Sequence, residues 1–220
     1  MEFAYGPESP EVVALAADPV MAAVTAAIGD VRVGVQTDRF VSLASAIVGQ
    51  QLSGAAASTI WRRFAALGPV EPAAVLGLDE AALRSCGLSG QKVRYLRDLS
   101  ERIHTGDLDL ASLDALDDDA VVAEVTRVKG VGRWTAEMFL LFSLARPDVL
   151  ALDDGGLLRA AGWALKLGRP ATGAELATAG EAWRPYRSVA SLYLWACLDR
   201  RLVPRNGAPG GLAPRETAAD

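Results

Sequence analysis

Cysteine and histidine are scarce in this chain of 220 residues. The two cysteines, Cys86 and Cys197, are too few for a disulfide framework or for a cysteine-ligated metal cluster. The single histidine, His104, excludes a multi-histidine metal site. We therefore expect no disulfide-stabilised fold and no metal ion held by side chains.

Long apolar runs are also missing, although half of the residues are hydrophobic (51%). No stretch of about 18 uninterrupted apolar residues appears, which argues against a membrane span. The N-terminal residues Met1 to Ala4 lack the basic start and apolar core of a secretory signal. The sequence therefore predicts a cytoplasmic, intracellular protein with no membrane partner.

Basic residues do not predominate, because 22 Lys and Arg face 27 Asp and Glu for a net charge of −5. Acidic residues concentrate between positions 107 and 124, whereas basic ones concentrate between 84 and 102, with Arg62 and Arg63 upstream. Each block taken alone is most simply a solvated helix face. If the partner is a polyanion, we expect the acidic block to face away from it. The modest basic face would then give a shallow salt dependence.

The apolar residues that are present recur at three- and four-residue intervals, and no alternating strand pattern stands out. An all-α fold is therefore predicted. The last segment, 204–220, is rich in Pro, Gly and Ala and is predicted to be a disordered tail. Pro and Gly pairs separate the expected helices, which are 10–17, 20–28, 38–50, 53–67, 71–76, 79–85, 91–104, 117–128, 133–145, 155–167, 173–182 and 186–200.

The string from Val128 to Ala136, Val-Lys-Gly-Val-Gly-Arg-Trp-Thr-Ala, is the most specific motif. Helical patterns before and after it leave only Lys129 to Gly132 between two helices, which predicts a helix–hairpin–helix. Gly130 and Gly132 can take positive φ and carry no Cβ to obstruct a close approach. Because the second helix begins with free N–H groups, the turn can bind an anion such as phosphate. An ordinary helix corner would also favour glycine, but the whole string favours phosphate.

Two acids, Asp153 and Asp154, follow about twenty residues later. The simplest role of either is to cap the next helix. A fixed carboxylate can also stabilise developing positive charge and orient an attacking water. Both roles can coexist in one residue, since capping would hold the carboxylate in place.

At these motifs the sequence resembles the helix–hairpin–helix superfamily of DNA base-excision glycosylases, in particular the alkylbase branch of 3-methyladenine DNA glycosylase II. Four stretches carry the resemblance, within about residues 38–200. The resemblance implies a compact two-lobed helical core over 1–203. Its lobes would form from the terminal segments and from the middle of the chain, with the hairpin at about 121–145 and an active-site cleft between the lobes. The four stretches are Ala46 to Ser53, Val128 to Ala136, Asp153-Asp154, and Trp183 to Ser188 followed by Leu194-Trp195.

The resemblance implies that Asp154, rather than Asp153, is the catalytic residue, because the spacing to Leu157 and Arg159 follows the superfamily pattern. Strand-cleaving members carry a lysine where this chain has Trp134, so a monofunctional enzyme that leaves an abasic site is implied. Lys129 precedes the turn and is a weaker covalent candidate. The alternatives are a bifunctional glycosylase/AP lyase for oxidised bases and a non-catalytic DNA-binding module.

The resemblance also implies a base pocket, in which aromatic faces would attract a cationic alkylated purine. Met138 stands where relatives often have tyrosine, which leaves the substrate range open. Core packing is the alternative for each aromatic residue, and it is expected for Phe139 and Phe142. The candidate pocket residues are Trp134, Met138, Trp195, Phe40 and Tyr193.

The implied partner is damaged double-stranded DNA, bound by a monomer. Gln51 falls at the position that fills the gap left by a flipped base, although a polar surface turn explains it equally well. The iron–sulfur cluster of some relatives requires four spaced cysteines and is not expected, and no other cofactor is. The resemblance implies a candidate site for a structural Na⁺ or K⁺ on hairpin carbonyls near Val128 and Val131, and the sequence leaves open whether an ion occupies it. The candidate DNA-binding residues are Gln50, Gln51, Ser53, Gly90, Lys92, Lys129, Gly130, Val131, Gly132, Arg133 and Thr135.

Overall fold

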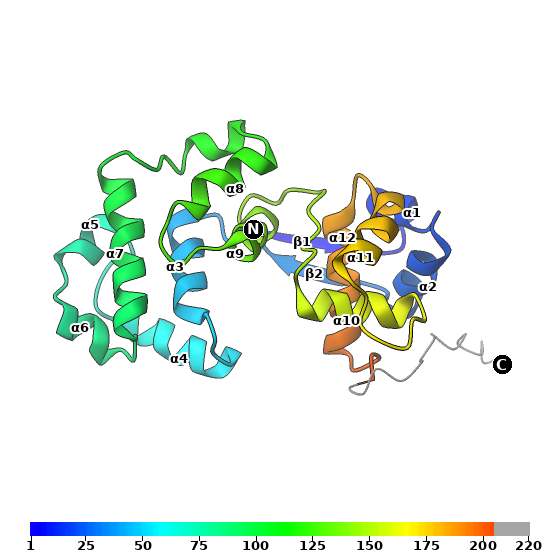
Figure 1. The fold of residues 1–220 in the computed structure, drawn as a ribbon, viewed down its shortest axis with the longest axis horizontal. Helices are drawn as coiled ribbons and strands as arrows, with labels where there is room; N and C mark the ends of the chain where they lie inside the picture. The colour runs from blue at the N-terminus through cyan, green and yellow to red at the C-terminus, as the bar shows by residue number, and fades with distance from the viewer. Residues whose placement is uncertain (205–220) are drawn as a thin grey trace. The chain divides into compact units, whose positions relative to one another are not determined.

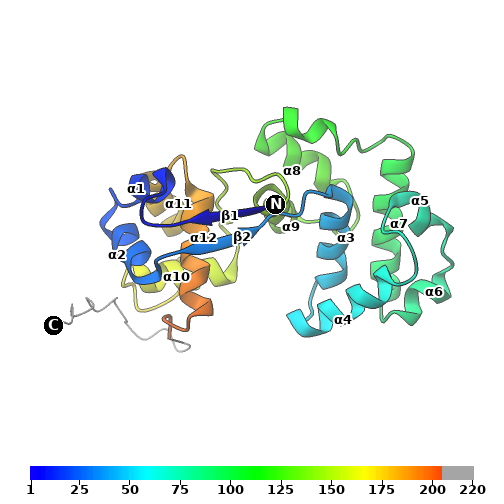
Figure 2. The same ribbon diagram turned by 180° about the vertical axis from the view of Figure 1, so that it is seen from behind.

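The computed structural model describes residues 1–204, so nearly all of the tail predicted at 204–220 lies outside the described residues. The chain divides into two compact units, each of which has its own internal contacts. One unit, the terminal unit, combines Met1–Gly34 with the chain from Arg146 onward, and the other, the middle unit, is Val35–Ala145. Figures 1 and 2 show their elements from two sides.

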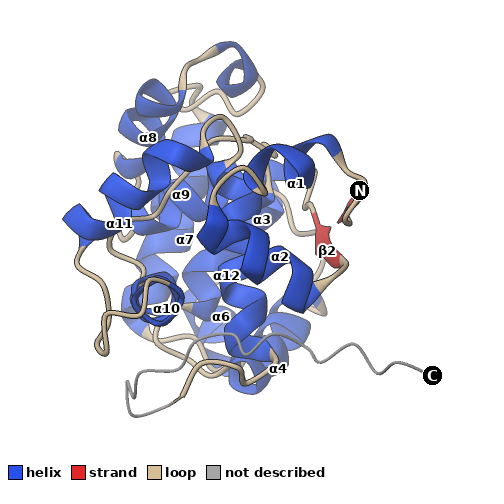
Figure 3. Ribbon diagram, turned by 90° about the vertical axis from the view of Figure 1, so that its right-hand side faces the viewer, coloured by secondary structure: helices blue, strands red, loops and turns tan. Residues whose placement is uncertain are grey.

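The terminal unit contains a small sheet that the sequence did not predict. Strand β1 (Glu2–Tyr5) pairs antiparallel with β2 (Val31–Gly34), with Phe3 opposite Val33. Each strand has only four residues, which is too short for a period of two to stand out in the sequence. The expectation of no strands is therefore wrong at this point, although helices dominate the structure and confirm the all-α class (Figure 3).

The helices of the terminal unit pack around α12, the last of them. Helix α12 contacts both α2 and α10. Its residues Tyr193 and Leu194 are fully buried, together with Trp183 and Leu157 of other segments. Burial of such large apolar side chains is the main stabilising contribution to this core. The helical elements are α1 (Pro10–Leu15), α2 (Pro19–Ile28), α10 (Gly155–Ala164), α11 (Gly173–Gly180), the 3₁₀ helix η2 (Glu181–Trp183) and α12 (Arg187–Asp199).

The middle unit is built on α7, which contacts α3, α5 and α6. The buried residues Leu96 and Leu99 form the inner face of α7. Helices α8 and α9 pack on each other, and α9 also contacts α3. The elements are α3 (Arg39–Gly49), α4 (Gly54–Ala65), α5 (Pro72–Gly77), α6 (Glu80–Ser85), α7 (Gly90–His104), the 3₁₀ helix η1 (Ser112–Ala115), α8 (Asp118–Thr126) and α9 (Arg133–Phe142).

Side-chain capping explains why most helices begin where the sequence predicts. The predicted cap Ser53 is confirmed, because its hydroxyl accepts the Ala56 N–H at 3.4 Å. An oxygen at this position satisfies one of the N–H groups that the first helical turn leaves without a partner. No helix among residues 1–204 is long and apolar enough to cross a membrane. The residues that cap in this way are Asp18, Asp38, Ser53, Asp79, Ser89, Asp117, Asp154 and Thr172.

Candidate functional site

The hairpin between α8 and α9 is a tight turn that requires glycine at position 130. Gly130 has φ +82, and a Cβ added to it would lie 2.1 Å from the ring of Tyr95. The turn closes through a hydrogen bond from Val131 N to Val128 O at 3.1 Å. The Val131 side chain is buried, so only its backbone can contact a ligand. Both positive φ and close packing thus exclude a side chain at position 130.

Gly132 serves a different purpose. Its φ is −95, so the expectation of a positive φ is wrong here, and an added Cβ would meet no atom within 4 Å. The protein's own packing therefore does not require glycine at this position. Gly132 is the N-cap of α9 and has no side chain to cover the first-turn N–H groups. The arrangement leaves the helix N-terminus open to an anion.

Two charged side chains flank the turn and remain at the surface. Lys129 is 70% exposed, with its Nζ 3.1 Å from Asp98 Oδ1. Arg133 is 64% exposed and donates from Nε to Glu137 Oε1 at 3.0 Å. Both side chains can leave these ion pairs and turn towards a phosphate at a small cost in free energy, because exposed ion pairs are weak.

Asp98 of α7 fastens the start of the hairpin. Its carboxylate accepts the Lys129 backbone N–H at 2.9 Å and the Arg102 Nε–H at 3.0 Å. Burial alone would raise the pKa of Asp98, but these hydrogen bonds and the Lys129 ammonium lower the pKa below its ordinary value. A carboxylate that accepts several charge-assisted hydrogen bonds fixes the backbone it holds.

The loop from α3 to α4 presents a strained residue to solvent. Gln51 adopts φ +58, a left-handed conformation that is costly for a residue with a Cβ, and it is exposed. The next residue, Leu52, is 37% exposed. Gln50 turns the other way, and its Nε2 donates to Gly130 O of the hairpin at 2.8 Å. Gln51 is thus at a loop tip, as its predicted insertion into DNA requires.

Lys92 has an internal role that the sequence did not predict. Its ammonium donates to Val48 O at 2.7 Å and to Gln50 O at 2.8 Å, so it holds the end of α3. Partial burial lowers the pKa of Lys92. The DNA contact of Lys92 stays a prediction. The neighbouring Gly90 is the first residue of α7, next to the capping Ser89, whose hydroxyl accepts the Lys92 N–H at 3.3 Å.

Asp154 in the terminal unit is held by two donors. Its Oδ1 accepts the Leu157 N–H at 2.6 Å, which makes Asp154 the N-cap of α10. The same oxygen accepts the indole N–H of Trp195 at 3.0 Å. Asp154 is half-buried, whereas Asp153 is exposed. The structure therefore gives Asp154 both the cap that sequence reasoning anticipated and a second fixing contact that it did not.

The segment that leads to Asp154 is tied to the start of α12. The Ser188 hydroxyl donates to Arg146 O at 2.6 Å and accepts the Val149 N–H at 2.9 Å. Arg187 binds Asp148, with its Nε 2.8 Å from Oδ1. Burial alone would raise the pKa of Asp148, but the hydrogen bonds from Arg187 lower it below the ordinary value. Helix α12 thus fixes both the approach to Asp154 and, through Trp195, its carboxylate.

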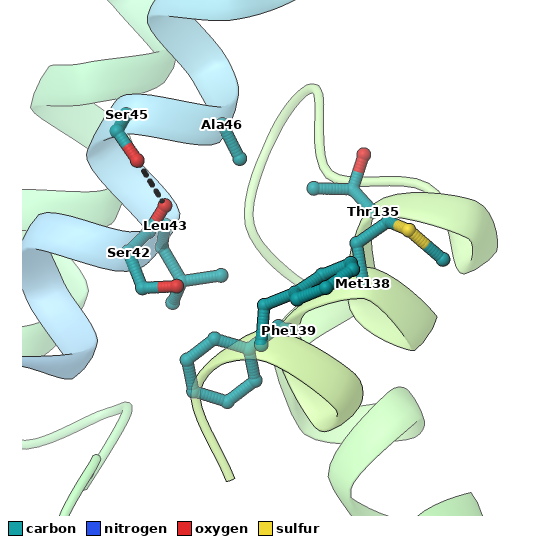
Figure 4. Close-up of a pocket in the computed structure, with 8 residues that line it drawn as sticks. Ser42, Leu43, Ser45, Ala46, Thr135, Met138 and Phe139 are labelled. Atoms are coloured by element: carbon teal, nitrogen blue, oxygen red, sulfur yellow. Dashed lines mark hydrogen bonds between the residues drawn. The ribbon is translucent and has the colours of Figure 1, made fainter. Parts of the chain in front are cut away.

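A pocket of about 200 Å³ opens in the middle unit between α3 and α9 (Figure 4). Met138, a predicted pocket residue, lines it together with Ser42 and Ser45 of the facing helix. Thr135 also lines it and is buried, so its predicted contact with DNA is wrong for the side chain. Phe139 and Phe142, assigned to the core from sequence, are lining residues too. Periodicity could not reveal this, because a pocket wall and a core face share the same helical spacing.

Two of the five predicted pocket residues belong to a core instead. Tyr193 is fully buried, and its hydroxyl donates to Tyr5 O at 3.1 Å and to Gly29 O at 2.9 Å. Phe40 is 5% exposed and does not line the pocket beside Met138. Trp134 differs from both, since it is 47% exposed at the start of α9. Tryptophan is usually well buried, so Trp134 differs from the core aromatic residues, and its role in a base pocket stays a prediction.

Comparison with known proteins matches residues 44–185 to the HhH-GPD superfamily of base excision DNA repair proteins. The chain belongs to this superfamily. It is 30% identical over 158 residues to DNA-3-methyladenine glycosylase 1 of Schizosaccharomyces pombe, covering 70% of this chain and 69% of that one. The crystal structure of a DNA-3-methyladenine glycosidase from Bacillus halodurans superposes with TM-score 0.82 at 38% identity, covering 89% and 92% of the two chains.

One of the matching structures contains DNA. The structure of an S. pombe 3-methyladenine DNA glycosylase in complex with abasic DNA has TM-score 0.79 at 26% identity, covering 87% of this chain and 97% of that one. That complex supports DNA binding by this member of the HhH-GPD superfamily. The hairpin and the Gln51 loop, both in the middle unit, stay the predicted contact points.

The acidic and basic blocks of the sequence are not simply solvated helix faces, because several of their residues contact one another or the backbone. Arg97 donates to Leu78 O at 2.6 Å, and Arg102 binds Asp98 and Asp107. Asp107 also pairs with Arg127. Several residues of the basic block therefore make contacts within the protein. In the acidic block, Asp107 forms ion pairs with arginine side chains.

Proposed function

We propose that this protein is a monofunctional DNA glycosylase that hydrolyses the N-glycosidic bond of alkylated purines such as 3-methyladenine. It would act on damaged double-stranded DNA as an intracellular monomer, after flipping the base, and leave an abasic site. One observation carries the proposal: the Asp154 carboxylate is fixed by Leu157 N–H and by Trp195 Nε1–H. A carboxylate held in this way is preorganised for charge stabilisation.

The reaction needs little more than such a carboxylate and water. As the bond from the sugar C1′ to the base nitrogen breaks, its electron pair leaves with the base, and positive charge develops on the sugar. Asp154 stabilises that charge and accepts a proton from the water whose oxygen bonds to C1′. An alkylated purine already carries positive charge, which makes it a good leaving group.

Several features support a reaction that stops at the abasic site. Trp134 occupies the hairpin position where the strand-cleaving relatives have lysine, and an indole cannot form a Schiff base. The nearest lysine, Lys129, has its ammonium 3.1 Å from Asp98 Oδ1.

The aromatic and apolar groups of the middle unit support a cationic or electron-poor base as substrate. Trp134 presents an exposed, electron-rich ring. Met138 and Phe139, which follow it on the same helix, line the pocket between α3 and α9. A cation over such a ring gains about 0.5–2 kcal/mol. Met138 offers a polarisable thioether, which favours alkylated purines over neutral ones.

A monovalent cation under the hairpin is also proposed. Among residues 1–204, Val128 O accepts a hydrogen bond from Val131 N, and a carbonyl oxygen has a second lone pair. Carbonyls that converge at such a turn could hold Na⁺ or K⁺ and brace the phosphate site. Replacing K⁺ by choline at constant ionic strength should weaken binding to abasic-site DNA. Equal affinity in both salts would contradict this proposal.

The decisive experiment is base release from duplexes that each carry one lesion, with Asp154→Asn as the test variant. Asparagine caps a helix as well as aspartate does, so the variant should keep its melting temperature and its binding to abasic-site DNA. Excision should fall by about a thousandfold or more, the scale for loss of a transition-state electrostatic contact. Full activity in this variant would refute the assignment, and loss in Asp153→Asn alone would move the role to the neighbouring residue.

The extent of the reaction needs a separate measurement. Borohydride reduces a Schiff base to a stable protein–DNA adduct. When wild-type protein acts on a duplex whose lesion it excises, we expect no such adduct. We also expect no strand cleavage until alkali is added. A trapped adduct that disappears in Lys129→Ala would establish the lyase alternative.

A further inference from the structure

Helix α7 holds together two loops that are far apart in the sequence. Lys92, Tyr95 and Asp98 are spaced three residues apart on α7, so they follow one side of the helix. Lys92 binds the end of α3, Tyr95 packs under Gly130, and Asp98 binds Lys129 N–H. All of these residues lie within the middle unit.

The contact of Lys92 falls on the peptide that sets the Gln51 conformation. The carbonyl of Gln50 belongs to the peptide bond that joins Gln50 to Gln51, and it accepts Lys92 Nζ–H at 2.8 Å. Val48 O accepts from the same ammonium at 2.7 Å. A helix C-terminus leaves carbonyls without partners and favours a cation there. The ammonium therefore resists rotation of the peptide plane next to the strained Gln51.

Gln50 links the same loop to the hairpin. Its side-chain Nε2 donates to Gly130 O at 2.8 Å, while its own carbonyl is held by Lys92. Gly130 in turn cannot shift towards α7, because the Tyr95 ring fills that space. The left-handed Gln51 turn and the open N-terminus of α9 are thus connected through one residue.

We propose that Lys92 and Gln50 are positioning residues that set the Gln51 turn at a fixed spacing from the hairpin, so that base extrusion and phosphate binding occur together. The inference rests on the proposed glycosylase function. Neither residue needs to touch the reacting atoms. A loop held in its strained conformation before binding lowers the cost of filling the gap in the base stack, because no ordering is required at that moment.

The test compares Lys92→Met, which keeps side-chain length but removes the donors, with the matched control Arg94→Met. Arg94 is exposed on the same helix, so its replacement removes the same charge. Single-turnover release of the lesion that the wild type excises fastest is measured in a paired duplex and in an unpaired bulge, where extrusion costs less. Fluorescence of 2-aminopurine beside the lesion reports unstacking directly.

Lys92→Met should lower the rate about ten- to a hundredfold in the paired duplex, the scale of a lost charged hydrogen bond. In the bulge its rate should fall by less than about threefold, and Arg94→Met should stay within about threefold on both substrates. Lys92→Arg should recover part of the paired-duplex rate. The 2-aminopurine signal of Lys92→Met should rise more slowly than that of the wild type.

Equal losses on both substrates, or an equal loss in Arg94→Met, would overturn the inference while leaving the glycosylase assignment intact. A wild-type protein that releases no alkylated base would instead refute the proposed function. If Lys92→Met fails to fold by circular dichroism, Gln50→Met carries the same test, because its side-chain contact lies at the surface. A Gln50→Met protein with the wild-type ratio of paired to bulged rates would then overturn the inference.

Discussion

The two glycines of the hairpin have separate reasons to be glycine. Gly130 needs its positive φ and the absence of a Cβ against Tyr95, whereas Gly132 has an ordinary φ and open space around it. A ligand that approaches the backbone closely is the proposed reason for a bare position there. Gly130 therefore serves the fold, and Gly132 is proposed to serve binding.

Replacing Gly132 by serine separates these roles. Serine is at least as good an N-cap as glycine, so Gly132→Ser should leave the melting temperature unchanged or raise it slightly. The new side chain would occupy the anion site and should weaken binding to abasic-site DNA about tenfold or more. Fluorescence anisotropy and thermal melting measure the two effects. Unchanged affinity would show that no phosphate approaches this N-terminus.

Trp195 supports Asp154 through the hydrogen bond from its indole N–H. Trp195→Phe keeps an aromatic ring but removes the donor, while the Leu157 N–H still caps the carboxylate. We expect the single-turnover excision rate to fall about tenfold, the worth of one hydrogen bond to a charged group. A loss seen only in KM would instead assign Trp195 to base binding, as the sequence resemblance suggested.

Among the elements, α7 is the one whose role changes most between sequence and structure. Its basic residues suggest a DNA-facing surface, yet Lys92, Arg97 and Arg102 hold neighbouring loops. A positive charge density along a helix does not distinguish a ligand surface from a set of internal contacts. The distinction depends on which carbonyls and carboxylates the fold brings within reach.

The hairpin should depend on pH through Asp98, whose pKa is lowered in the folded state. A lowered pKa means that the stabilising contribution is complete above the ordinary value of 3.8 and is lost as pH falls through the folded-state pKa. Near neutral pH, Asp98→Asn should reduce the free energy of unfolding by about 1–3 kcal/mol. The difference between variant and wild type should shrink in acid below about pH 4. Urea unfolding at several pH values measures it, and a difference that grows in acid would contradict the assignment.

At the scale of the whole molecule, a net charge of −5 sets limits on how DNA is bound. We expect affinity to come mainly from a few contacts at the hairpin and the Gln51 loop rather than from a basic surface. We expect Arg62 and Arg63 on α4 to add to it, because both lie at the surface. Non-specific binding should accordingly be weak.

The salt dependence of binding tests this view. Each neutralised phosphate contributes about −0.9 to the slope of log K against log salt concentration. For abasic-site duplex we expect a slope of about −2 to −4, which corresponds to two to four phosphate contacts. Anisotropy titrations across a range of NaCl concentrations give the slope. A value steeper than about −6 would reveal an extended basic surface that the structure does not suggest.

The sequence by itself determined what depends on local chemistry. Helix positions follow from apolar spacing and capping residues, the hairpin from Gly-Val-Gly between two helical patterns, and Asp154 as a cap from its place before α10. The superfamily could be identified from the same motifs. Each of these signals depends on residues that are close together in the sequence.

Only the tertiary structure decided which residues meet across the sequence. The sheet of β1 and β2, the Trp195 contact with Asp154, and the Lys92 contact with Gln50 join residues that are 26 to 42 positions apart. It also separated Tyr193, buried in a core, from Trp134, exposed at the hairpin, although both are aromatic residues in helices. Periodicity shows that a side chain points inward or outward on its own helix. Whether it meets a core, a pocket or a carbonyl depends on the partner that folding places against it.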